Sequence, residues 1–96
     1  MSPLKRKKLN KIRFQLDRLD NSLIKLIKQR TNLVKKVLAL KDKKSQIVDQ
    51  KRIKYILKNI RKKSLVNNID PKITNRIWKN MIWSYIDFEK RNFKKK

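Results

Sequence analysis

An apolar seam near the N-terminus, interrupted by one cation, most constrains the fold of this chain. Apolar residues recur at alternating steps of three and four, which places them along one stripe of an α-helix. The stripe comprises Leu9, Ile12, Leu16, Leu19, Leu23, Leu26, Leu33, Val37 and Leu40, with Arg30 where the pattern requires an apolar side chain. The pattern predicts one helix from about Leu4 to about Lys41.

The predicted helix is too long for the chain to bury by itself. At about 1.5 Å per residue it is on the order of 55 Å long. A compact globule of this size has a radius of gyration of only about 12 to 13 Å. We therefore expect an intertwined homodimer, in which a second copy of the chain covers the seam.

Two shorter helices are predicted after a break at residues 42–49. Gly is absent and Pro occurs twice, so long helices are favoured over tight turns. Asp49 can cap a second helix that fades near residues 64–68, and Asp70-Pro71 is typical of the start of a third. The apolar faces are Ile53, Ile56, Leu57 and Ile60 in the second helix and Ile73, Ile77, Trp78, Met81, Ile82, Tyr85, Ile86 and Phe93 in the third. We expect one all-α domain over residues 1–96, ending in a frayed basic tail.

The composition excludes several kinds of chemistry. The chain has no Cys and no His, which excludes disulfides, the usual zinc ligands and an imidazole base. Its apolar runs are far too short for a membrane span, and no apolar signal core follows the basic start MSPLKRKKLN. We expect a cytoplasmic protein without a metal or another cofactor.

The net charge of +23 has two interpretations. A strong positive field favours anionic partners such as nucleic acid. Lys, Ile and Asn are abundant together, however, as in proteins of AT-rich genomes, and many lysines fall on polar helix faces rather than in one patch. The sequence therefore favours a solvated surface, and a nucleic-acid partner is not expected.

Arg30 points to an anion-binding site. A buried guanidinium is costly unless it is paired or binds an anion, and an ion pair with Asp20 or Asp49 is one explanation. Lys41 lies about 16 Å further along nearly the same side of the helix, and Arg52 at the start of the second helix can close a third side. These cations outnumber the nearby acids, which suggests a small ligand with more than one carboxylate.

Two further residues bear on this site. Arg13 lies about 25 Å from Arg30 on the same helix, so it can reach the same ligand only from the partner of an antiparallel dimer; otherwise it is an exposed cation. Glu89, the single glutamate, follows the apolar face of the third helix. An acid there is either kept protonated or paired with Arg13, Arg30 or Lys41.

The chain resembles the small all-helical chorismate mutases over about Leu9 to Phe93. The resemblance rests on IRFQLDRLDNSLIKLIKQRTNLVKKVLALK, VDQKRI and IDPKITNRIWKNMIWSYIDFE. In that family an Arg is followed by an Asp seven residues later, an Arg ten further on and a Lys eleven after that. Arg13, Asp20, Arg30 and Lys41 match this pattern in register.

The resemblance implies a homodimeric enzyme of the shikimate pathway that converts chorismate to prephenate for aromatic amino-acid biosynthesis. One chain would supply Arg30, Lys41 and Arg52, and the other would supply Arg13. The arginines would hold the two carboxylates of the substrate. Lys41 would donate to the ether oxygen, whose bond to carbon breaks. Asp49 would lie near the ring hydroxyl and Tyr85 near the ring carboxylate. Such a Claisen rearrangement needs a folded substrate and well-placed donors, with no nucleophile or metal.

Two departures from the family bear on the substrate. Ile53 follows Arg52 where the family usually has a Glu that accepts from the C4 hydroxyl. Glu89 stands where many members have a Gln that donates to the ether oxygen, and a Glu donates only when protonated. We therefore expect either faster catalysis at acidic pH, or a balance in which Lys41 and burial together hold the Glu89 proton. MIWSYIDFE also resembles the isochorismate-pyruvate lyases, which carry an aliphatic residue after the same Arg, so this lyase activity is the alternative.

Two hypotheses belong to other classes of protein. A basic helical dimer could bind nucleic acid through phosphate contacts, although phosphate-binding cations should project into solvent and Arg30 lies in the apolar seam. A coiled-coil adaptor would explain the seam without explaining Arg30, Lys41 and Glu89 together. The sequence therefore favours the enzyme.

Overall fold

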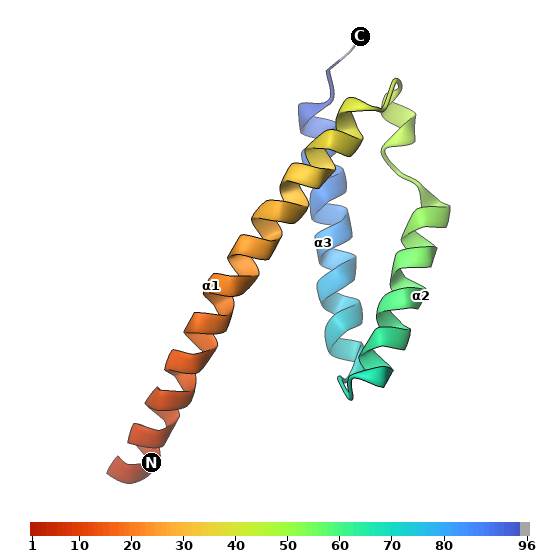
Figure 1. The fold of residues 1–96 in the computed structure, drawn as a ribbon. Helices are drawn as coiled ribbons and strands as arrows, with labels where there is room; N and C mark the ends of the chain where they lie inside the picture. The colour runs from red at the N-terminus through yellow and green to blue at the C-terminus, as the bar shows by residue number, and fades with distance from the viewer. Residues whose placement is uncertain (95–96) are drawn as a thin grey trace. The chain divides into compact units, whose positions relative to one another are not determined.

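Three α-helices make up most of the protein in the computed structural model, which describes residues 1–94 (Figure 1). Helix α1 spans Pro3–Ala39, α2 spans Gln50–Val66 and α3 spans Pro71–Asn92, with one 3-10 turn, η1, at Lys44–Gln46. No strand occurs in the described residues, and the prediction of an all-α, three-helix fold is confirmed. Helix α1 ends slightly earlier than predicted, which leaves Lys41 in the loop. The end of the predicted basic tail, Lys95 and Lys96, lies outside the described residues.

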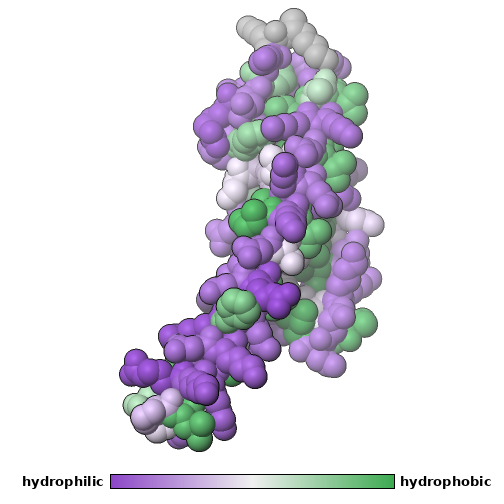
Figure 2. Space-filling view, turned by 60° about the vertical axis from the view of Figure 1, so that its left-hand side comes forward, coloured by the Kyte–Doolittle hydropathy of each residue, from purple (hydrophilic) through white to green (hydrophobic). Residues whose placement is uncertain are grey.

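The chain divides into two compact units, Met1–Leu33 and the part from Val34 onward. The first unit consists almost entirely of the N-terminal part of α1, and α1 as a whole has no buried residue. Leucines of the seam remain more than half exposed, including Leu16, Leu19 and Leu26. Figure 2 shows hydrophobic side chains open to solvent between hydrophilic ones on the face in view. The seam is therefore an apolar surface without a cover in the single chain.

The second unit has a small apolar core. Helices α2 and α3 pack side by side and run in opposite directions (Figure 1). The buried core residues are Ile47 from the loop before α2 and Ile82 and Ile86 from α3. Around them pack the partly buried side chains of Leu38, Val48, Ile53, Ile56, Leu57 and Phe93. These contacts fix the loop between α1 and α2 against α3.

The turn between α2 and α3 is set by local hydrogen bonds. The backbone N–H of Ile69 donates to the carbonyl of Ser64, and that of Asn68 donates to Leu65, as in a Schellman C-cap. Asn68 has a φ of 56°, a left-handed conformation that Asn tolerates better than most residues other than Gly. The Asp70 carboxylate then accepts from the N–H of Lys72, with Pro71 in the first turn of α3. The predicted Asp-Pro helix start is thus confirmed.

A buried hydroxyl links the two helices near this turn. Ser64, only 2% exposed, donates to the carbonyl of Ile60. Its oxygen lies 2.6 Å from the Thr74 hydroxyl of α3. The Thr74 hydroxyl also lies within hydrogen-bond distance of the Pro71 carbonyl. Because the Ser64 hydroxyl is buried, its removal leaves the Thr74 hydroxyl without a partner on α2.

We expect Ser64→Ala to destabilise the protein by about 1 to 2 kcal/mol, because it leaves the Thr74 hydroxyl without its inter-helix partner. Urea unfolding followed by circular dichroism would measure the change. Ser84→Ala is the matched control, since Ser84 is an exposed serine of α3 and gains the same helix propensity. Equal midpoints for the two variants would contradict a stabilising role of the Ser64–Thr74 contact.

Candidate functional site

The Lys41–Glu89 ion pair is the centre of the candidate site. Lys41 Nζ lies 3.1 Å from Glu89 Oε1. The Glu89 side chain is 7% exposed and that of Lys41 is 18% exposed, so both charges are largely withdrawn from water. Of the partners considered for Glu89 from the sequence, the structure contains the pair with Lys41. Burial makes this pair costly to break on one side only, because a lone buried charge would remain.

Lys41 is held by the loop that follows α1. Its backbone N–H donates to the Leu38 carbonyl, which closes the last turn of the helix. Gln46 Oε1 then accepts from the backbone N–H groups of Asp42 and Lys43, at 2.8 and 2.9 Å. Ile47, 3% exposed, anchors the far end of the loop in the core. The loop therefore presents Lys41 to the C-terminal part of α3.

Sequence reasoning missed the roles of Gln46 and Ile47. Ile47 follows five polar residues in the segment DKKSQIVD. An apolar residue in such a loop indicates that its side chain is buried and anchors the loop. Gln46 carries no such signal, because its hydrogen bonds depend on the turn geometry of η1.

Asp49 and Arg52 lie together at the start of α2. Asp49 is the N-cap, and its carboxylate accepts from the backbone N–H of Arg52 at 3.1 Å. The Arg52 guanidinium lies 5.3 Å from the centre of the Tyr55 ring, within cation–π range. Because Arg52 is exposed, the Tyr55 face can orient it while its donors stay open to a ligand. The predicted capping role of Asp49 is confirmed, and the contact with Tyr55 is new.

Tyr85 lies one turn before Glu89 on α3 and is half-buried. The spacing of four residues places the two side chains on the same face, about 6 Å apart along the axis. Ile53, next to Arg52, packs against the core and presents no hydrogen-bonding group. A ligand near Arg52 therefore meets an aliphatic surface at this position.

A cavity of about 490 Å³ adjoins Lys41. Its walls include Leu38, Phe88 and Phe93, and its cations include Lys35 and Lys94. The volume falls in the range of about 300 to 1,000 Å³ that is common for small-ligand pockets. Glu89 and Tyr85 are not among its described lining residues, so this cavity alone does not define the predicted site.

The remaining two predicted site residues, Arg13 and Arg30, belong to the first unit. Both lie on α1, separated by about 25 Å along its axis. One chain therefore cannot bring both of them to the same small ligand from this helix. How they join the residues of the second unit is part of the proposal below.

Among the predicted site residues, the second unit contains the cations Lys41 and Arg52, a buried carboxylate and a half-buried tyrosine. The contact between Lys41 and Glu89 joins the loop after α1 to α3. No helix in residues 1–94 combines the length and the apolarity that a membrane span requires.

Comparisons with known proteins identify the family of the chain. The family described as chorismate mutase type II matches residues 12–90. A chorismate mutase of Methanocaldococcus jannaschii is 38% identical over 76 residues, which cover 78% of this chain and 77% of that protein. No solved structure matches the chain. The family match covers most of the chain and both of its units, and the chain therefore belongs to the type II chorismate mutase family.

Proposed function

We propose that the chain is a chorismate mutase, an isomerase that rearranges chorismate to prephenate in aromatic amino-acid biosynthesis. The observation that carries the proposal is the Lys41–Glu89 pair, with one donor cation and one buried acid in a family of mutases. We take residues 1–96 as one domain, since the family match runs through both units. The expected cytoplasmic location stays a prediction.

The proposed mechanism is electrostatic. Arg30 and Arg52 of one chain and Arg13 of a second chain would hold the two carboxylates and fold the substrate into its reactive conformer. Negative charge would then develop on the ether oxygen as its bond to carbon breaks. Lys41 would donate to that oxygen, which stabilises the transition state more than the ground state. Asp49 and Tyr85 would contact the ring hydroxyl and ring carboxylate.

A homodimer would complete this site. The support is the exposed seam of α1, because a helix of 37 residues without a buried side chain needs a second surface. Two antiparallel copies of α1 would cover each other's leucines and bring Arg13 of one chain near Arg30 of the other. Each dimer would then contain two equivalent sites.

The product assay is the direct test of the reaction. We expect purified protein to convert chorismate to prephenate, and isochorismate to remain largely unchanged. Pyruvate and salicylate from isochorismate, with little prephenate, would instead identify a lyase. One observation favours that alternative: Ile53 packs into the core and cannot accept from a C4 hydroxyl. Turnover of neither compound would contradict both assignments.

Mixed dimers test the shared site. We expect Arg13→Ala and Arg30→Ala each to lower activity by about 10²- to 10³-fold, the loss seen when one preorganised donor is removed. Co-refolding the two variants should restore about a quarter of wild-type activity, because half of the dimers are mixed and each has one intact site. Arg18→Ala is the matched control on α1. If both arginines served one site from the same chain, mixing would restore nothing.

The pH dependence tests the role of Glu89. Protonated, Glu89 can donate to the ether oxygen; ionised, it pairs with Lys41 and opposes the developing negative charge. We therefore expect kcat/KM to be higher at pH 5 than at pH 7.5, because only a protonated carboxyl can donate. Glu89→Gln should flatten this profile and exceed wild type at pH 7.5.

Asp87→Asn is the matched control for this experiment. Asp87 is an exposed acid of α3, and its carboxylate accepts from Arg91 rather than from Lys41. Its removal makes the same change in charge two residues from Glu89. An unchanged pH profile in Glu89→Gln, or an equal flattening in Asp87→Asn, would contradict the proposed role.

A further inference from the structure

Helix α2 contains seven basic residues and no acid among its 17 residues. Five of the basic residues recur at steps of three and four, so they form one stripe along the helix. These are Lys51, Lys54, Lys58, Arg61 and Lys62, and all five are exposed. The stripe is about 16 Å long.

Helix α3 carries a second basic stripe around an exposed tryptophan. Its cations are Lys72, Arg76, Lys79 and Lys90, all exposed. Trp83 lies four residues after Lys79 and seven before Lys90, which places the indole in the same stripe. Its exposed fraction is 50%, so a large aromatic surface is open to solvent among cations.

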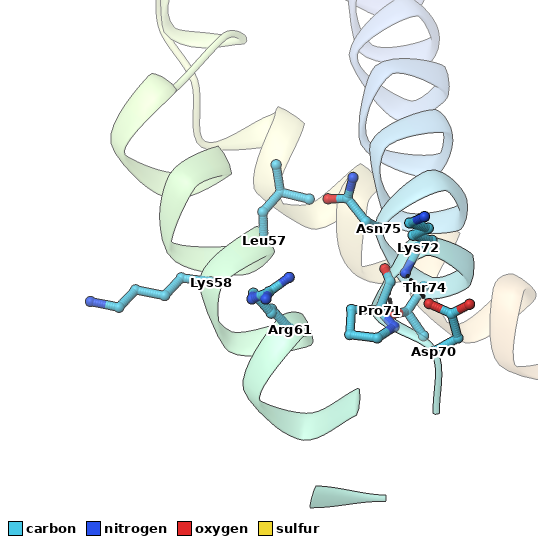
Figure 3. Close-up of a pocket in the computed structure, with 8 residues that line it drawn as sticks. All are labelled: Leu57, Lys58, Arg61, Asp70, Pro71, Lys72, Thr74 and Asn75. Carbon is cyan, nitrogen blue, oxygen red and sulfur yellow. Dashed lines mark hydrogen bonds between the residues drawn. The ribbon is translucent and has the colours of Figure 1, made fainter. Parts of the chain in front are cut away.

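One cavity borders part of each stripe. It measures about 640 Å³, and Lys58 and Arg61 of α2 and Lys72 of α3 are among its lining residues. Figure 3 shows Leu57 and Asn75 reaching toward each other across the gap, while Lys58 extends away from the helix pair. We call the nine cations of the two stripes, together with Trp83, the basic face.

The basic face is not neutralised by nearby acids. Asp70, at the cavity, caps α3 through the N–H of Lys72, and Asp87 pairs with Arg91. Within residues 1–94, neither ion pair of the second unit includes a cation of the basic face. The cavity end of the basic face is distant from the candidate active site, because Lys72 lies about 25 Å before Glu89 along α3, whereas Lys51 and Lys90 are sequence neighbours of Arg52 and Glu89.

We propose that the basic face binds single-stranded nucleic acid. The cations match a phosphate backbone, and binding would release counterions. Trp83 supplies a surface on which an unstacked base can stack, as aromatic residues do in single-strand binding proteins. The recess between the helices can admit a base or a phosphate, whereas a flat anionic membrane cannot enter it. This activity would be additional to the mutase reaction.

The test is fluorescence anisotropy with a labelled oligo(dT) of about 20 nucleotides, titrated over a range of salt concentrations. We expect a triple variant, with Lys58→Gln, Lys72→Gln and Lys79→Gln together, to bind at least tenfold more weakly. It should also reduce the slope of log affinity against log salt by about 2, since each phosphate contact on a single strand contributes about 0.7. The matched control is Lys5→Gln/Lys7→Gln/Lys8→Gln, which removes the same charge from α1.

Trp83→Ala tests the stacking contact. We expect about tenfold weaker binding to oligo(dT), partial recovery in Trp83→Phe, and little change in Phe14→Ala, which removes an exposed aromatic residue of α1. Circular dichroism would confirm that each variant stays helical. Ultraviolet crosslinking of wild-type protein to oligo(dT) should label the peptide that contains Trp83, and this readout needs no variant.

Several outcomes would overturn the proposal. Equal loss of affinity in the two triple variants would show that only the overall charge matters. If heparin binds as tightly as oligo(dT) and Trp83→Ala has no effect, the surface binds polyanions in general. The same result with anionic vesicles would identify a membrane surface. No binding at low salt would exclude a nucleic-acid site altogether.

Discussion

The shortage of apolar cover for α1 is the constraint on which the rest of the structure depends. Only Ile47, Ile82 and Ile86 form the buried apolar core of the described residues, and none of them lies on α1. The exposed seam is too long for two shorter helices to cover. In the dimer that we propose, a second copy would supply the missing surface, and stability would then depend on the protein concentration. The same requirement would complete the catalytic site.

The fold could be predicted from the sequence because its signals are local. The seam spacing, the Asp49 cap and the Asp70-Pro71 start each depend on neighbouring residues, and the structure contains all three helices. The site was less predictable. That Lys41 would pair with Glu89 depends on where Ile47 and Gln46 place the loop, which is a tertiary property. Arg52 was predicted, but its orienting partner Tyr55 was not.

The relation between the basic stripes of α2 and α3 could not be predicted from the sequence. From the sequence, the lysines looked like a scattered solvated surface, because each helix has basic residues on its polar side. A stripe on one helix cannot be related to a stripe on another until the pairing of the helices is known. The cavity between α2 and α3 supplies that relation, since Lys58, Arg61 and Lys72 all line it. Trp83 lies in the stripe of α3, and half of its surface is exposed in the single chain.

The two proposed ligands make different demands on the same positive charge. For a small substrate with two carboxylates, the positive field would mainly raise the association rate. Its binding would depend on buried donors such as Lys41, and salt screens such buried charges only weakly. A polyanion gains through many exposed phosphate contacts, which salt weakens steeply. A net charge of +23 also repels itself, and a bound polyanion would relieve this repulsion. Salt concentration should therefore separate the two activities of one chain, with nucleic-acid binding lost at ionic strengths that leave turnover largely intact.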